Sequence, residues 1–181
     1  MGIDIEDDTR NFLKMLNKKT NVEPVTYKKR LLISGMGGSG IAGRILETLG
    51  YYDSIGEIIA WTDYGLPNWI KPEDNIICIS YSGNTAETLS AAIEAQKRGC
   101  TIEVITTGGK LGSLAEKNRW DKIVVEEGHQ PRAALPLLLK PLLHKLNLPN
   151  LKEITTDVSN QKYEKNKSKT IAGNIFTKIP C

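Results

Sequence analysis

Twice in this sequence, a short apolar run is followed by a junction of small or hydroxyl residues and then by a helix-like stretch. This pattern constrains the fold more than any other feature. The run Leu31–Ser34 leads through glycines to Ile41–Leu49, and the run Ile76–Ser80 leads through hydroxyl residues to Glu87–Lys97. Each combination is typical of a strand, a loop and a helix, which together form a βα unit. The sequence therefore predicts an α/β domain.

Three further apolar runs predict additional strands. They are Ile58–Trp61, Ile102–Thr106 and Ile123–Val125. Nearly continuous apolar character suits the strands of a parallel sheet that helices cover on both faces. We therefore expect a three-layer, doubly wound parallel sheet.

Helix-like segments flank these units. Asp4–Leu16 has apolar residues at helical spacing and predicts a short leading helix. Ala133–Leu146 is also helix-like, but Pro136 and Pro141 interrupt it, so we expect a broken or kinked helix there.

Composition excludes several classes of protein. A formal net charge of +3 over 181 residues is too small an excess to indicate a nucleic-acid partner. No apolar run approaches the length that crosses a bilayer, and the three cysteines have no metal or disulfide spacing. We expect a cytoplasmic protein with no metal and no membrane partner.

The glycine-rich stretch Ser34–Gly43 follows the first predicted strand and opens a helix. Its glycines let backbone N–H groups approach an anion or sugar oxygens at the helix N-terminus. The stretch also fits the dinucleotide pattern G-x-G-x-x-G in two registers, with Glu57 and Asp63 as acidic candidates expected beyond the next strand. A nucleotide, another phosphorylated ligand and a ligand-free tight turn all remain open from this stretch alone.

A second junction carries four hydroxyl residues: Ser80, Ser82, Thr85 and Thr88. Hydroxyl and amide groups together bind the oxygens of a phosphate monoester without a metal, and the dipole of the following helix assists. A helix N-cap is the commoner role for any one of these residues. Four of them in one loop favour a phosphate site.

Three motifs resemble a known family: GMGGSGIAG, SYSGNTAET and the Gln130–Ala134 sequence QPRAA. In this order they are similar to the first SIS (sugar isomerase) domain of archaeal-type bifunctional phosphoglucose/phosphomannose isomerases. The resemblance implies a flavodoxin-like SIS fold and an aldose–ketose isomerase that interconverts glucose 6-phosphate or mannose 6-phosphate with fructose 6-phosphate. It implies a hexose 6-phosphate ligand and no cofactor or metal.

The resemblance also implies the residues of the site. Those expected to contact the sugar are Gly37, Gly38 and Ser39. Those expected to bind its phosphate are Ser80, Ser82 and Thr85. Arg132 is the expected catalytic residue at the reacting carbons, where a permanent positive charge stabilises the oxyanion of an enediol.

Isomerisation also needs a general base and a ring-opening group, which the resembling family takes from a second, similar domain. We therefore expect 1–28 to be an N-terminal helix and linker, 29–150 an SIS domain, and 151–181 a linker and the start of a second SIS domain that this sequence lacks. The two histidines, His129 and His144, are not expected to be catalysts.

Two functional hypotheses remain open at this point, beside an NAD-type dehydrogenase domain that the glycine pattern suggests and the hydroxyl loop argues against. One is the phosphosugar-binding half of an isomerase, inactive without a base from elsewhere, and the other is a non-catalytic module that senses a phosphosugar. We expect a homodimer in either case, because a sheet domain that normally packs against a sibling leaves an apolar face uncovered when it is alone.

Overall fold

The computed structural model describes residues 30–53 and 56–146, together with residues 11, 12, 14–16, 22–24 and 27; for residues 51–53 it describes the backbone alone. Residues 11, 12 and 14–16 are helical, and the rest of the predicted leading helix lies outside the described residues. The segment 151–181 also lies outside them.

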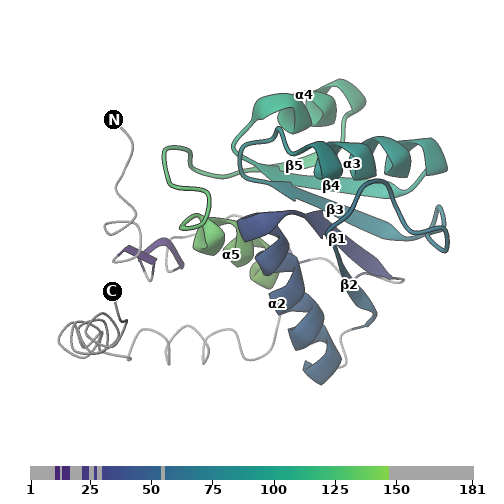
Figure 1. The fold of residues 1–181 in the computed structure, drawn as a ribbon. Coiled ribbons are helices and arrows are strands. Elements are labelled where there is room, and N and C mark those ends of the chain that lie inside the picture. The colour runs from purple at the N-terminus through teal and green to yellow at the C-terminus, as the bar shows by residue number, and fades with distance from the viewer. Residues whose placement is uncertain are drawn as a thin grey trace, which may run out of the picture.

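Five parallel strands form one sheet in the order β2-β1-β3-β4-β5 (Figure 1). The strands are β1 (Leu31–Gly35), β2 (Ile58–Trp61), β3 (Asn75–Ser80), β4 (Thr101–Thr106) and β5 (Asp121–Val124). This order is that of the flavodoxin-like doubly wound folds. The predicted fold class is confirmed.

Within the described residues, four helices of ten or more residues cover the sheet, two on each face (Figure 1). They are α2 (Gly37–Asp53), α3 (Ala86–Arg98), α4 (Gly109–Asn118) and α5 (Leu135–Lys145). Helices α2 and α5 pack on one face, and α3 and α4 pack on the other.

The central strands are apolar on both faces, which explains why their sequences read as continuous apolar runs. In β3, Ile77 and Ile79 join the core cluster under α2 and α5, whereas Ile76 and Cys78 join the cluster under α3 and α4. Successive side chains of a strand point to opposite faces, so a sheet covered on both sides has no polar alternation.

Helix α5 runs unbroken from Leu135 to Lys145. Of the two forms that the sequence predicted, broken or kinked, the broken one is therefore wrong. Pro136 lies in the first turn, where its missing N–H has no helical partner to lose. Pro141 lies inside the helix, where Leu138 and Leu142 on either side of it are fully buried in the core. Their burial offsets the one hydrogen bond that Pro141 removes.

The topology creates one place where consecutive βα connections diverge. Strands β1 and β3 are neighbours, yet the chain leaves β1 toward α2 on one face and leaves β3 toward α3 on the other. In open α/β sheets ligands bind in the crevice beyond the carboxyl ends of the strands at such a switch point. Both the glycine-rich loop and the hydroxyl loop begin at this edge.

Candidate functional site

The hydroxyl loop begins at Ser80, the last residue of β3, and ends at Thr85, which occupies the N-cap position of α3. The Thr85 side chain makes no capping hydrogen bond. Its Oγ1 atom lies 2.9 Å from Oγ of Ser80 instead. The N-cap role is therefore not realised by Thr85, and its hydroxyl does not occupy the N–H groups of the first helical turn.

The tip of this loop is held by backbone contacts. Gly83 has a φ of 68°, and a methyl group added to it would lie 1.9 Å from the carbonyl oxygen of Gly108. The exposed Ser82 accepts a hydrogen bond at its Oγ from the N–H of Asn84 at 3.3 Å. Only glycine fits this approach, so the position of Gly83 fixes where the Ser82 hydroxyl stands.

A layer of buried hydroxyl residues lies beneath the first turn of α3. Thr88 is fully buried on the sheet-facing side of α3, and its Oγ1 has no hydrogen-bond partner among the described residues. Ser34, Ser80 and Thr106, each at most 1% exposed, lie at or next to the carboxyl ends of β1, β3 and β4 on the same face of the sheet. At the carboxyl end of the sheet, the buried side chains on this face therefore carry hydroxyl groups instead of being purely apolar.

The glycine-rich loop is tied directly to the hydroxyl loop. Ser39 is 8% exposed, and its Oγ accepts a hydrogen bond from the N–H of Tyr81 at 3.3 Å. The Ser39 hydroxyl keeps a proton that it can donate. Gly37, at the mouth of the loop, is exposed and has a φ of 54°, and a methyl group added to it would meet no atom within 4 Å.

The segment that carries Arg132 packs against the same glycine loop. A methyl group on Gly38 would lie 2.9 Å from the carbonyl oxygen of Pro131 and 3.5 Å from Cα of Arg132. Arg132 itself is exposed. The N–H groups of Ala133 and Ala134 donate to the carbonyl oxygen of Gln130 at 2.9 and 3.0 Å, which closes a turn before α5.

The three sequence motifs therefore meet at one edge of the sheet, although they lie far apart in the chain. Sequence reasoning missed Tyr81, whose backbone N–H links the hydroxyl loop to the glycine loop. Its only sequence signal is an aromatic residue inside a loop of small polar ones.

The two histidines lie in different parts of the fold. The backbone N–H of His129 donates to the Tyr81 hydroxyl at 3.0 Å, and His144 lies in the last turn of α5. Burial and the nearby Lys140 lower the pKa of His144. Burial also raises the pKa of the Cys78 thiol to about 12, so this cysteine is no nucleophile near neutral pH.

The dinucleotide alternative loses part of its support. Glu57 precedes β2 and so lies at the amino end of the sheet, opposite the glycine loop; its candidacy as the acidic residue was wrong. Asp63 follows β2, but its Oδ1 accepts a hydrogen bond from the N–H of Tyr64 at 2.7 Å. The strand order is also not the 3-2-1-4-5-6 order of the dinucleotide folds.

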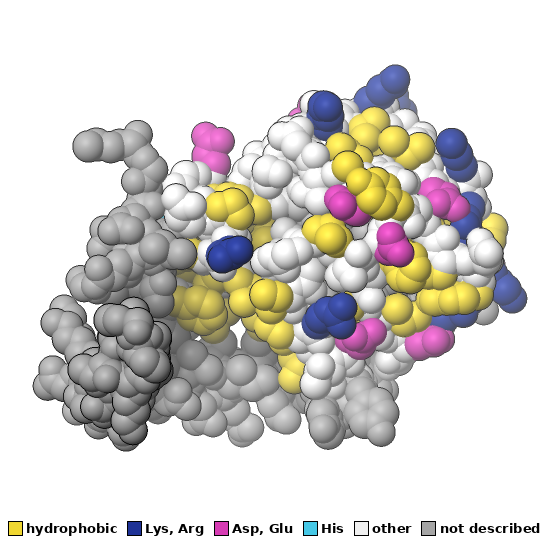
Figure 2. Space-filling view, viewed as in Figure 1, with side chains coloured by type: hydrophobic (Ala, Val, Ile, Leu, Met, Phe, Trp, Pro, Cys, Tyr) yellow, Lys and Arg dark blue, Asp and Glu magenta, His cyan; other side chains and the backbone are white. Residues whose placement is uncertain are grey.

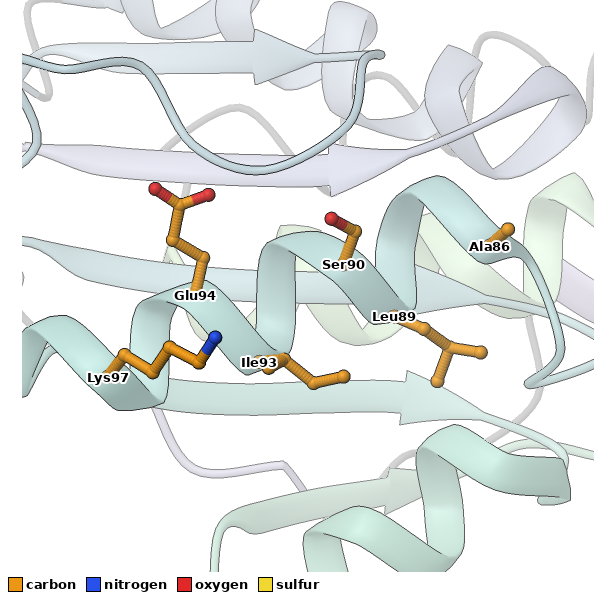
Figure 3. A pocket seen from close by; sticks show the side chains of 6 residues that line it. All are labelled: Ala86, Leu89, Ser90, Ile93, Glu94 and Lys97. Carbon is orange, nitrogen blue, oxygen red and sulfur yellow. The ribbon is translucent and has the colours of Figure 1, made fainter.

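Two surface hollows lie along the outer side of α3 and between α3 and α4, and each is lined by one residue of the SYSGNTAET motif, Ala86 in the first and Asn84 in the second. In Figure 3, Ser90 and Glu94 point to one side of α3, and Leu89 and Ile93 point to the other. Hydrophobic side chains on the face shown in Figure 2 are interspersed with Lys, Arg, Asp and Glu. These hollows contain none of the residues expected to bind phosphate or sugar.

Within the described residues, no helix has the length and apolar character that a membrane span requires. The same part of the chain holds no cluster of three or more His, Cys, Asp or Glu side chains that could coordinate a metal ion.

Comparison with known proteins identifies a family. Residues 25–136, more than half of the chain, match the SIS domain. Among solved structures, the sugar isomerase domain of an RpiR transcription factor from Sphaerobacter thermophilus superposes with a TM-score of 0.56 at 16% identity, covering 87% of this chain and 96% of that one. At this identity the likeness concerns the fold alone.

Curated relatives carry the name bifunctional phosphoglucose/phosphomannose isomerase. The protein from Thermoplasma volcanium is 35% identical over 150 residues, which are 81% of this chain and 47% of the relative. The protein from Caldicellulosiruptor bescii is 42% identical over 127 residues, which are 70% of this chain and 37% of the relative. The chain thus spans at most about half the length of these relatives.

Proposed function

Because the chain belongs to the SIS domain family, we propose that the edge beyond β1 and β3 binds the hexose 6-phosphate of an aldose–ketose isomerase. The proposed reaction interconverts glucose 6-phosphate or mannose 6-phosphate with fructose 6-phosphate. The observation that carries the proposal is the meeting of three separate motifs at the switch point of the sheet.

The phosphate is proposed to bind at the hydroxyl loop. Ser80, Ser82 and Thr85 present hydroxyl groups there, and the side chain of Thr85 leaves the first-turn N–H groups of α3 uncapped. An anion at this position gains from the partial positive charge of the helix N-terminus. No metal is needed for a phosphate bound in this way.

The sugar is proposed to extend from the phosphate toward Gly37, Gly38, Ser39 and Arg132. The reaction moves a proton from C2 to C1 of the open-chain aldose through an enediol, and the hydroxyl protons of O1 and O2 rearrange with it. Negative charge develops on oxygen during this transfer. The Arg132 guanidinium, which stays protonated, supplies a fixed positive charge beside that oxygen.

The general base and the ring-opening acid are proposed to come from outside the described residues. The relatives named as isomerases extend well beyond the region that this chain matches, since the chain covers 47% and 46% of the two Thermoplasma proteins. We also propose that the chain acts as a homodimer. A domain that binds the phosphosugar without catalysing its conversion is the second candidate, and a combined binding and turnover experiment separates the two.

The first test is a thermal-shift titration of the chain with fructose 6-phosphate and with 6-phosphogluconate. We expect both ligands to raise the melting temperature, because a ligand that binds only the folded state stabilises it. Ser82→Ala should abolish the shift for both ligands. Arg132→Ala should weaken the binding of both sugars and leave that of inorganic phosphate unchanged.

The control is Ser113→Ala, which removes an exposed hydroxyl from α4, whose Oγ donates to the Gly109 carbonyl oxygen. No shift at millimolar ligand would refute the proposed binding site. Binding together with turnover of fructose 6-phosphate in a coupled assay would support the isomerase, and binding without turnover would favour the second candidate for this chain.

A further inference from the structure

Tyr81 connects all the loops of the candidate site. Its backbone N–H donates to Oγ of Ser39 in the glycine loop at 3.3 Å. Its carbonyl oxygen accepts from Oγ1 and from the N–H of Thr107, after β4, at 2.7 and 3.1 Å. Its neighbours in sequence are two of the residues proposed to bind phosphate.

The side chain of Tyr81 reaches a fourth segment. Its hydroxyl donates to the carbonyl oxygen of Glu126 at 3.1 Å and accepts from the N–H of His129 at 3.0 Å. These two residues belong to the connection between β5 and α5, which continues to Arg132. Tyr81 thus binds the arginine-bearing connection at two backbone groups.

Tyr81 is buried, which distinguishes its hydrogen bonds to this connection from hydrogen bonds on the surface. The residue is 8% exposed, and its ring lies in the core cluster under α2 and α5. The ring is therefore held by packing, and its hydroxyl is placed by that packing at the base of the connection. Glu126 is exposed, and the connection packs against the glycine loop at Gly38.

We propose that Tyr81 is a positioning residue, which through its hydroxyl holds residues 126–132 in place and so sets the position of Arg132 over the sugar. The inference rests on the proposed function. Tyr81 acts from the opposite side of its own loop, because Ser80 and Ser82 are the residues proposed to bind the phosphate, whereas the Tyr81 side chain lies in the core cluster under α2 and α5. This role requires the Tyr81 hydroxyl, because a phenylalanine would pack in the same way but could not form the two hydrogen bonds.

The test is Tyr81→Phe, with Tyr64→Phe as the matched control. Tyr64 is 58% exposed and lies after β2, so the same deletion there removes a hydroxyl that is not part of the connection between β5 and α5. We expect Tyr81→Phe to raise the dissociation constant of fructose 6-phosphate about tenfold, which corresponds to one hydrogen bond in the positioning of the loop. The dissociation constant of inorganic phosphate should stay within about twofold, because the hydroxyl loop binds phosphate without Arg132.

A double-mutant cycle tests whether Tyr81 acts through Arg132. In the Arg132→Ala background we expect Tyr81→Phe to change the dissociation constant of fructose 6-phosphate by less than about twofold. A residue that merely supports the fold would weaken phosphate and fructose 6-phosphate equally and would do so in both backgrounds. That result would overturn the inference.

Hydrogen exchange gives a readout that does not depend on a ligand. We expect the amide of His129 to exchange at least about tenfold faster in Tyr81→Phe than in Tyr64→Phe, since it loses its acceptor. Unchanged exchange would overturn the holding of the connection even if ligand binding weakened. If the wild type binds neither fructose 6-phosphate nor phosphate, the proposed function fails and the effect on the sugar falls with it, while the exchange result still decides whether Tyr81 holds residues 126–132.

Discussion

The amino end of the sheet and its carboxyl end use polar side chains in opposite ways. At the amino end, before β1 and β3, polar groups bind one another. Nε and Nη2 of Arg30 donate to the two carboxylate oxygens of Asp74 at 3.3 and 3.1 Å, and the N–H of Lys71 donates to Asp74 at 2.8 Å. The Arg30 guanidinium also stacks 5.0 Å from the centre of the Trp69 ring.

At the carboxyl end, some polar side chains do not use all of their hydrogen-bonding groups within the described residues. Thr85 does not cap its helix, the Thr88 hydroxyl has no partner within the described residues, and Ser82 stands exposed. Buried polar groups are normally satisfied inside the protein. This difference fits the proposed function, in which the amino end serves stability and the carboxyl end keeps donors for a ligand.

The substitution Gly83→Ala disrupts the loop at the carboxyl end of the sheet, and we expect it to have the largest effect. The added methyl group would meet the Gly108 carbonyl oxygen, and the positive φ adds strain, so we expect a loss of about 3 kcal/mol in the free energy of unfolding and a loss of phosphate binding. Urea denaturation measures the first and thermal-shift titration the second. Gly99→Ala is the control, because Gly99 has a similar φ of 78° but its nearest neighbour is 4.0 Å away; equal losses in both variants would contradict the contact.

The substitution Asp74→Ala removes polar contacts at the amino end of the sheet, and we expect a smaller loss of stability than for Gly83→Ala. It removes the acceptor of two charged hydrogen bonds, and we expect the free energy of unfolding to fall by about 2 kcal/mol. The dissociation constant of fructose 6-phosphate should not change, because Asp74 lies at the far end of the sheet. Glu116→Ala removes an exposed pair with Lys122 and should change stability much less. Weakened sugar binding in Asp74→Ala would remove the contrast between the two ends.

Thr88→Val sharpens the contrast at a single hydroxyl. Replacing a buried hydroxyl without a protein partner by a methyl group should stabilise the ligand-free chain by about 1 kcal/mol, as measured by urea denaturation. Thr85→Val is the comparison, because the Thr85 hydroxyl lies within hydrogen-bonding distance of Ser80 and its loss should destabilise the chain. Destabilisation by Thr88→Val would mean that its hydroxyl is already satisfied.

The smallest expected effect is a change in pH dependence in the amino half of the sheet. Glu103 forms an ion pair with Lys145 of α5 and faces Tyr27 and Asp121. Burial raises its pKa, and this outweighs the lowering by Lys145. A carboxyl group whose pKa is raised by folding contributes stability at low pH and loses it as the pH rises through the folded pKa.

We therefore expect the wild type to lose stability relative to Glu103→Gln as the pH rises above the usual range of a glutamate. Denaturation of both proteins at a series of pH values measures the difference in slope. A wild type that gains stability over this interval would show that Lys145 lowers the pKa of Glu103 more than burial raises it.

The sheet could be predicted because its central strands are apolar on both faces. The prediction for the edge strand β5 begins two residues late, since Asp121 and Lys122 are polar at an edge with less to bury. Helix α4 was not predicted, because its sequence GKLGSLAEKN carries two glycines and few apolar residues. Tertiary packing of Leu111 and Ala115 forms this helix.

The motifs of the candidate site could be found in the sequence, but their arrangement could not. Nothing in the sequence indicates that Gly38 packs on Pro131, because this contact joins backbone atoms. The hydroxyl of Tyr81 meets backbone groups 45 and 48 residues away, and backbone groups leave no pattern in side-chain types. The roles carried over from the resemblance remain predictions until ligands are tested.

The backbone contact between Gly38 and Pro131 has a consequence for how such a domain diversifies. The hydroxyl loop belongs to β3 and α3, whereas the arginine-bearing segment belongs to the connection after β5. That segment packs directly on the backbone of Gly38, because Gly38 has no side chain to stand between its own backbone and Pro131. Under the proposed function, substitutions after β5 would therefore alter which sugar is accepted and leave the residues of the phosphate-binding loop unchanged. Related domains would then diversify in substrate through one surface segment while they keep the same phosphate-binding loop.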